Sequence, residues 1–484
     1  MTAVGILLVV ALGGLYAAGI RAILQVPFRA LGILVGGMAF HNIVLMILLR
    51  LGTPDFLVRV VQAWKEGIVL LLFLLVARVA SDGWRAGRRP RLAFIDWLVV
   101  AFTLVVIVYF FLPSRVFGVT ITFSQRLVGL RLDLLLPALY LFGRVFWTNR
   151  RADLEWVFAA IVGSAAVVGL VGAIELWLIP TQFWLDAGVN RLSSWLGFAY
   201  QGPRGLPENF FQTSAEGWLL RRAVSTYVSP LGIAYPGLLV VPLAVAFAAR
   251  RWQSARDGVI AISLLALTVV GVLFSLTRLA LVLMAVEIGL LALFLRRAWL
   301  FAATGVVAAA VLFMLYLYPQ VGPLLTRDLS PVQHRGTVHI VTRGDPSLQE
   351  HAGLLGYDFV YVRQHPLGTG LGSAVHRFGA SQGTGESAVF DFFGELGVVG
   401  GTLYLPTYFL MTMAGMRALV RARSDVLLSG LPLVASIGGL MLFLITLTSD
   451  VWGNFAVTFL FWWAAGYSVS LLTRPANVAL QSAA

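Results

Sequence analysis

The feature that most constrains this chain is a series of apolar runs, each about 20 residues long, that recur along the sequence. Because a helix rises about 1.5 Å per residue, a run of about 20 apolar residues crosses a hydrocarbon layer about 30 Å thick. Unpaired backbone amides are costly in lipid, so a spanning segment must be a helix or part of a closed barrel, and the alternating pattern of a barrel strand is absent. The sequence therefore predicts an all-α polytopic membrane protein.

We predict about thirteen spans, with an error of about one. They cover residues 3–20, 30–49, 60–80, 93–112, 132–147, 156–179, 231–249, 258–276, 279–295, 298–318, 394–415, 426–448 and 455–472. The first run has no basic start, which favours a span over a cleaved signal peptide. Charged residues make up 12% of the chain, against about 25% in soluble domains. We therefore predict a single membrane domain, 1–484, with two long polar loops at 180–230 and 319–393.

The orientation follows from the arginines of the short loops. If the spans alternate, the basic segments all fall on one side, which the excess of positive charge assigns to the cytoplasm. These segments are 85–91, 143–151, 250–256, 296–297 and 417–423. The opposite, non-cytoplasmic face then receives both long loops.

The composition favours the binding of anions and excludes thiol chemistry. The net charge is +13, and Lys65 is the one lysine among 35 basic residues. The planar fork of arginine suits phosphate, although codon bias explains the same ratio equally well. The chain has no cysteine, which excludes disulfides, thiolate metal ligands and thiol nucleophiles.

Four external arginines lie where a predicted span meets water. Arg221 and Arg222 precede the span at 231–249, Arg278 lies in the turn SLTRLA, and Arg363 precedes the glycine-rich run. If these side chains converge, they form a cationic pocket that fits a lipid-borne diphosphate. The alternative is that each arginine interacts singly with lipid headgroups.

The glycine-rich run HPLGTGLGS (365–373) lacks the Lys-Ser/Thr ending of a nucleotide-binding loop and follows no predicted strand. We therefore do not expect a nucleotide site here. The glycines allow a tight turn, which is either close to a phosphate or sugar or purely structural.

Three acidic residues follow in the segment 385–401. Asp391 and Glu395 are four residues apart and share one helix face, whereas Glu386 lies at the edge of the loop. Glu386 could act as a general base toward a sugar hydroxyl. The alternative is an acid at a helix N-terminus, favoured by the helix dipole.

The histidines do not indicate a metal site. Five of the six lie in the large loop, and their spacing gives no metal-binding pattern. They are His334, His339, His351, His365 and His376. No Asp-x-Asp motif occurs in the external loops, so we expect no metal. His41, beside Asn42 in a span, is expected to form a polar contact between helices.

Three segments, taken in order, resemble one known family. They are RRAVSTYVSPLGIAYPGLLVVPLA (221–244), LFSLTRLALVLMAVEIGLLALF (273–294) and HPLGTGLG followed by ESAVFDFFGELGVVGG (386–401). In these segments the chain resembles the O-antigen polymerase and O-antigen ligase superfamily, whose members join lipid-linked glycans outside the bacterial inner membrane. The resemblance covers about residues 220–401 and implies a membrane glycosyltransferase similar to the GT-C class, with its active site on the periplasmic face.

The resemblance also implies roles for particular residues. Arg222 and Arg278 match the arginines that hold undecaprenyl diphosphate, and Arg221, Arg363 and His365 are expected to bind substrate. Glu386 stands where ligases have the His of a His-Asn-x-x-Leu pattern. A glutamate can still take a proton from a hydroxyl, so catalysis is compatible with the change, but the departure favours a polymerase over a ligase.

The implied partners are an undecaprenyl diphosphate-linked glycan, the bilayer and a chain-length regulator, with no nucleic acid, cofactor or metal. Two other classes of function remain open. A lipid-phosphate-sugar transferase would carry acids in its first external loop, but the segment 50–59 offers only Asp55. A lipid or solute transporter would show internal repeats and charges deep in its spans. No repeat is convincing, and Glu175 and Glu287 are the best candidates for such charges.

Overall fold

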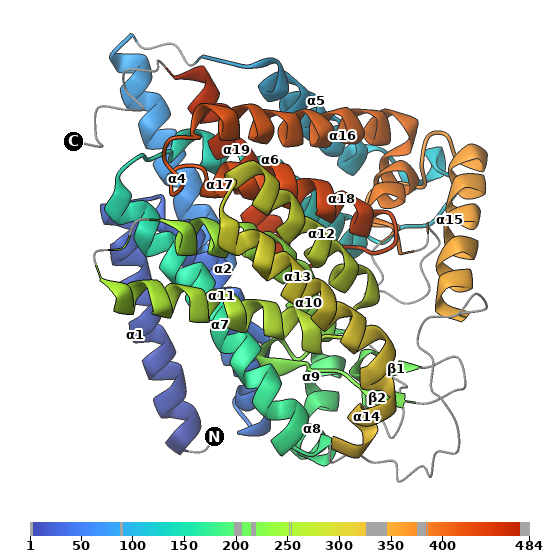
Figure 1. The fold of residues 1–484 in the computed structure, drawn as a ribbon. Helices are drawn as coiled ribbons and strands as arrows, with labels where there is room; N and C mark the ends of the chain where they lie inside the picture. Colours follow the sequence, from blue (N-terminus) through green and yellow to red (C-terminus); the bar gives the residue numbers. More distant parts are fainter. Residues whose placement is uncertain are drawn as a thin grey trace. The chain divides into compact units, whose positions relative to one another are not determined.

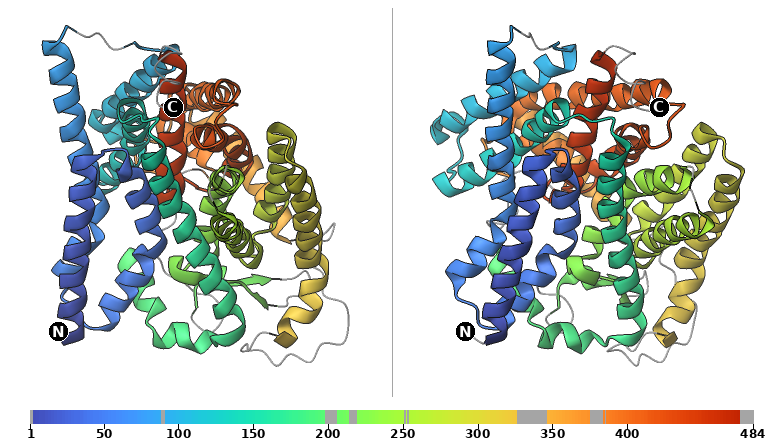
Figure 2. Two further views of the ribbon diagram at one scale, coloured as in Figure 1. Left: turned by 60° about the vertical axis from the view of Figure 1, so that its left-hand side comes forward. Right: turned by 90° about the vertical axis from the view of Figure 1, so that its left-hand side faces the viewer.

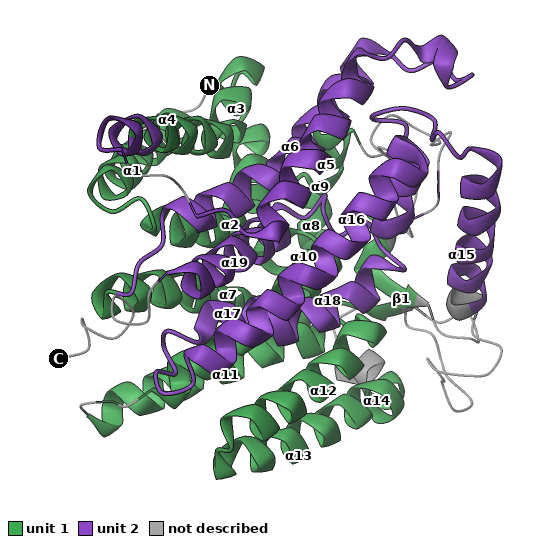
Figure 3. Cartoon of the chain, turned by 90° about the horizontal axis from the view of Figure 1, so that it is seen from above, with its two compact units in different colours: residues 1–78, 150–345 green, residues 79–149, 346–484 purple. Residues whose placement is uncertain are grey.

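The computed structural model describes residues 3–87, 91–197, 206–213, 219–250, 252, 254–325, 346–374, 384 and 386–474. Nearly every element among them is a helix (Figure 1). Internal contacts divide the chain, which the sequence analysis treats as one domain, into two compact units (Figure 3). Unit 1 comprises Met1–Arg78 and Arg150–Asp345, and unit 2 comprises Val79–Asn149 and Pro346–Ala484.

Eleven helices in the described part of the chain are long and apolar enough to cross a membrane. This confirms the prediction of an all-α, multi-pass membrane protein, and every predicted span overlaps a helix. The helix that covers the predicted span 132–147 begins earlier, at Phe123, and is not among the eleven. It carries Arg126, Arg131, Asp133 and Arg144, which lower its hydropathy. The predicted span 426–448 is a shorter apolar helix, Gly430–Thr446.

Unit 1 is built around α7, which packs against α2, α10 and α11. Figure 2 shows α2 beside both α1 and α7. The helices are α1 (Ala3–Gln25), α2 (Arg29–Arg50), α3 (Asp55–Gln62), α4 (Trp64–Arg85, which continues into unit 2), α7 (Arg151–Leu178), α8 (Thr181–Asp186), α9 (Val189–Leu196), α10 (Pro230–Ala249), α11 (Ala255–Phe274), α12 (Arg278–Leu295), α13 (Ala298–Leu312) and α14 (Tyr318–Leu325), with a π-helical turn, η5 (Phe313–Leu317), between the last two. The helices α7 and α11 meet at Gly169 and Gly271, where a Cβ on Gly271 would lie 2.9 Å from the Cα of Gly169.

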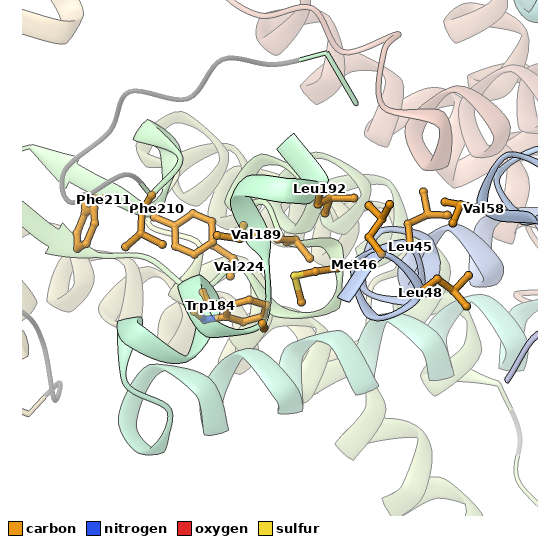
Figure 4. Packing of buried hydrophobic residues seen from close by; sticks show 14 residues of the cluster. Leu45, Met46, Leu48, Val58, Trp184, Val189, Leu192, Phe210, Phe211 and Val224 are labelled. Carbon is orange, nitrogen blue, oxygen red and sulfur yellow. The ribbon is translucent and has the colours of Figure 1, made fainter. Parts of the chain in front are cut away.

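The connection between α7 and α10 packs against the end of α2 and against α3. It contains α8, α9, the short turns η3 (Glu208–Phe210) and η4 (Ser225–Tyr227), and an antiparallel pair of strands, β1 (Phe211–Thr213) and β2 (Leu219–Arg221). Phe211 pairs with Arg221 in this pair. Trp184, Val224 and other buried residues of this connection belong to one hydrophobic cluster with Leu45 and Val58 (Figure 4). The described part of the predicted first long loop is therefore folded and packed against α2.

Unit 2 has α19 packed against α6 and α16. Its elements are α5 (Phe94–Phe111), η1 (Ser114–Val116), α6 (Phe123–Val145), α15 (Pro346–Gln364), α16 (Ala388–Arg421), α17 (Gly430–Leu433), a π-helical turn η7 (Val434–Gly438), α18 (Gly439–Thr446) and α19 (Phe455–Thr473). The helices α6 and α19 approach closely at Gly143 and Gly466. A Cβ on either glycine would collide with the backbone of the other helix, at Trp463 and Tyr140 respectively. Small residues at helix contacts are typical of membrane bundles.

Polar residues cap the first turns of α10 in unit 1 and of α16 in unit 2. The hydroxyl of Ser229 accepts a hydrogen bond from the Gly232 amide at the start of α10, and that of Ser387 accepts one from the Phe390 amide at the start of α16. Such caps satisfy amides that have no partner within the helix. These serines thus mark where each of the two helices begins.

Candidate functional site

The candidate site in unit 1 forms where the end of β2 meets the turn between α11 and α12. The backbone amide of Arg222 donates to the carbonyl of Phe210 at 3.0 Å, and that of Ala223 donates to the carbonyl of Phe274 at 2.9 Å. The segment after β2 therefore lies beside the end of α11. This places Arg222 next to the turn Ser275–Thr277, although the two are distant in sequence.

The side chain of Arg222 is fixed on this turn. Its Nε donates to the carbonyl of Ser275 at 2.7 Å, and its Nη2 donates to the Thr277 hydroxyl at 2.8 Å. Only 6% of the residue is exposed. Burial lowers the pKa of the Arg222 guanidinium to about 10, and the positive charge of Arg278 contributes to the lowering. Arg222 is therefore charged at neutral pH, and the structure brings it close enough to Arg278 for the two charges to interact.

The N-terminus of α12 adds to this positive potential. Arg278 is its first residue and is partly exposed, and Thr277 is its N-cap residue. Thr277 makes no side-chain cap to the first turn of the helix; its hydroxyl accepts from Arg222 instead. Because amides and the helix dipole make a helix N-terminus favourable for anions, two arginines beside such a terminus are suited to a phosphate group.

Arg221 points away from this turn. Its Nη1 donates to the carbonyl of Ile179, just beyond α7, and its Nη2 lies 3.5 Å from an oxygen of Glu175. Only 2% of Arg221 is exposed. Its expected role in substrate binding remains a prediction, but its guanidinium contacts the end of α7 and not the turn at Arg278.

The candidate base lies in unit 2. Glu386 is exposed and immediately precedes Ser387, the N-cap residue of α16. The sequence places Glu386 at the edge of a loop, and in the structure it lies just before the start of α16. The other two acids of the segment lie within α16, where Asp391 accepts a hydrogen bond from the Thr384 hydroxyl at 2.7 Å.

The glycine-rich run packs against a kink in α16. Gly397 has a φ of 66°, which interrupts the helix, and the amide of Val398 donates to the carbonyl of Pro366 at 2.9 Å. The amides of Gly372 and Ala374 both donate to the buried carboxyl of Glu395 at 2.9 Å. Because these amides are hydrogen-bonded within the protein, the geometry supports the structural interpretation of this turn and gives no support to a phosphate cradle.

The remaining predicted substrate residues also lie in unit 2. Arg363 is exposed near the end of α15. His365 follows this helix, and its ring lies 4.6 Å from the ring of Tyr361. The predicted residues thus form two groups, one in each unit: Arg221, Arg222 and Arg278 in unit 1, and Arg363, His365 and Glu386 in unit 2.

The histidines and acids of the described segments show no group of three or more that could hold a metal ion. His334, His339 and His376 lie outside the residues that the structure describes. His41 accepts a hydrogen bond from the indole of Trp64 at 3.1 Å, and Asn42 donates to the carbonyl of Tyr227 at 2.8 Å. Both side chains therefore make polar contacts with neighbouring segments.

Two contributions to the arginine site are not evident from the sequence. Thr277 lies in the quoted turn SLTRLA, but nothing local shows that its hydroxyl accepts from Arg222. Glu175 is noticeable as an acid in an apolar span, but its contact with the segment at 221–225 depends on the tertiary fold. Comparison of the chain with protein-family models and with curated proteins finds no match to either.

Proposed function

We propose that the protein is a glycosyltransferase of the bacterial inner membrane, an O-antigen or exopolysaccharide polymerase. Its donor is a glycan on undecaprenyl diphosphate, and its acceptor is a hydroxyl of a lipid-linked repeat unit. One observation carries the proposal: Arg222 is fixed beside Arg278 at a helix N-terminus that has no side-chain cap. A diphosphate offers the paired oxygens and the negative charge that such a site favours.

The reaction needs no external source of energy. The bond between C1 of the donor sugar and the diphosphate oxygen breaks, and its electron pair leaves with the diphosphate. The acceptor oxygen forms the new bond to C1 and loses its proton to the base. Negative charge grows on the diphosphate as the bond breaks, so arginines that hold it stabilise the transition state more than the ground state.

Glu386 is the proposed base. Its side chain is exposed just before the start of α16. A carboxylate can take the proton of a sugar hydroxyl, as the histidine of ligases is expected to do. The presence of Glu where ligases have His supports polymerase over ligase activity.

The donor site is tested by replacing its arginines in cells that lack their own polymerase. Arg222→Ala and Arg278→Ala should abolish the ladder of glycan lengths on a gel while protein levels stay unchanged. Arg115→Ala is the control, because Arg115 is an exposed arginine of the turn η1 and is not part of the proposed site. A full ladder from both site variants would refute the donor site.

Polymerase and ligase activity are separated with purified protein. Incubation with a lipid-linked repeat unit alone should give longer glycans if the protein is a polymerase. Products that form only after lipid A core is added would identify a ligase.

One observation favours a transporter as the second candidate. Glu287 lies in the middle of α12, is fully buried, and forms no side-chain hydrogen bond with the described residues. An ionisable group inside a span is costly and often marks a path for ions or protons. Movement of labelled lipid in vesicles that depends on Glu287, without glycan elongation, would establish transport in place of polymerisation.

A further inference from the structure

The end of α7 carries a buried carboxylate that the proposed reaction does not use. Glu175 is fully buried, and its Oε2 accepts from the amide of Ser225 at 2.6 Å and from that of Val224 at 3.1 Å. Its Oε1 lies 3.5 Å from Nη2 of Arg221. A single side chain of α7 thus holds three residues of the segment that contains Arg222.

This segment has a backbone conformation that must be held in place. Ser225 has a φ of 48° and Val228 one of 55°, both in the left-handed region that L-residues rarely adopt. The hydroxyl of Ser225 donates to the carbonyl of Val168 on α7 at 2.7 Å. At Gly172, a Cβ would lie 3.3 Å from the Cβ of Ala223, so this glycine lets the segment approach α7 closely.

Arg221 and Arg222 are adjacent but face opposite ways. Successive side chains of extended backbone point to opposite sides. The side chain of Arg221 contacts Glu175 and the carbonyl of Ile179, whereas that of Arg222 contacts the turn at Ser275 and Thr277. Fixing Arg221 on α7 therefore directs Arg222 toward the turn beside Arg278.

We propose that Glu175 is a positioning residue of the arginine site and that Arg221 is its counter-charge and not a ligand of the substrate. This inference rests on the proposed diphosphate site. Through Arg221 and the amides of Val224 and Ser225, Glu175 holds Arg222 in the orientation that binds an anion.

Replacing Glu175 changes the affinity for an anion in opposite directions if its role is positioning and if it acts only through its charge. Glu175→Gln removes a negative charge near the site while keeping the size of the side chain. If Glu175 acted through its charge alone, its loss would make the site more positive, and an anion would bind more tightly. If Glu175 positions Arg222, the same change weakens binding.

The experiment measures the affinity of the purified, full-length protein for undecaprenyl diphosphate, with inorganic pyrophosphate as a second probe. We expect Glu175→Gln to weaken binding by about tenfold or more. Arg221→Lys should bind nearly as well as the wild type, because the positive charge next to Glu175 is kept. Arg222→Lys should bind much more weakly, because the fork that reaches both Ser275 and Thr277 is lost.

The matched control is Asp153→Asn, at the other end of α7. Asp153 is also buried and forms an ion pair with Arg29 at 3.2 Å. This variant should lower the melting temperature, as Glu175→Gln should, but leave the affinity unchanged. A purely structural role for Glu175 would give two variants that behave alike.

Three results would overturn the inference. The first is unchanged or tighter binding by Glu175→Gln. The second is a loss in Arg221→Lys as large as that in Arg222→Lys, and this comparison decides the matter if Glu175→Gln does not fold. The third is wild-type binding by Arg222→Ala, which would remove the proposed donor site as well. A loss in Arg222→Ala with no loss in Glu175→Gln would refute only the positioning role.

Discussion

Replacing Glu395 by Gln should destabilise unit 2, whereas the same change at Glu386 should leave its stability unchanged and slow glycan transfer. The two glutamates belong to one segment of sequence but differ in their surroundings. Glu395 is buried, and its two carboxyl oxygens accept hydrogen bonds from the backbone amides of Gly372 and Ala374. Glu386 is exposed ahead of the cap of α16.

The size of the expected loss of stability follows from these contacts. Gln keeps one acceptor oxygen, so at Glu395→Gln either the Gly372 or the Ala374 amide is left facing an NH2 group. A buried donor without a partner costs about 1–3 kcal/mol. For a unit of this size, about 2–4 °C of melting temperature is lost per kcal/mol, so we expect a fall of about 2–12 °C. At the exposed Glu386 the change in stability should stay within about 0.5 kcal/mol. The loss of a general base should slow transfer by about 10²–10⁴-fold.

The assay pairs thermal unfolding of the purified protein in detergent with the rate of glycan elongation on a lipid-linked repeat unit. The reasoning is refuted if Glu395→Gln melts at the wild-type temperature, or if Glu386→Gln elongates glycans at the wild-type rate. A fully stable but inactive Glu395→Gln would move the base from Glu386 to Glu395.

Three further predictions concern metal, packing and pH. Elongation by the purified protein should be unaffected by EDTA, and a loss that Mg²⁺ restores would contradict the metal-independent mechanism. Gly143→Ala should lower the melting temperature, because its Cβ would meet the backbone of α19, at a cost of about 1–3 kcal/mol; Gly353→Ala, where nothing lies within 4 Å, is the control. Because burial lowers the pKa of Arg222 to about 10, this group stays protonated at neutral pH. The affinity for undecaprenyl diphosphate, measured by titration, should therefore be constant up to about pH 9 and fall as the pH passes about 10, whereas a fall near neutral pH would show that another group controls binding.

The apolar helices can be identified from the amino-acid sequence alone. The length and hydropathy of a run are local properties, and they decide whether a helix is stable in lipid whatever its neighbours are. The error at α6 has the same origin, because the charged residues Arg126 and Arg131 lower the hydropathy of the first turns of that helix, which the predicted span 132–147 leaves out. Hydrogen bonds made within the protein offset part of the cost of such charges: Arg126 donates to the carbonyl of Leu112 at 2.6 Å and to the hydroxyl of Ser114 at 2.7 Å.

The sequence also singled out most residues of the candidate site but not their neighbours. Arg222 and Arg278 stand out as charges at the ends of spans, and Glu175 as an acid within one. The sequence does not show which of the two adjacent arginines faces an anion. Successive side chains of extended backbone point to opposite sides, and the sequence fits either assignment of the two sides. The answer depends on the fold: the end of β2 lies beside α7, so Arg221 contacts Glu175, and Arg222 lies beside the turn before α12. Hydrogen bonds and ion pairs act over a few ångströms, so the fold, by bringing distant segments together, determines which groups they join.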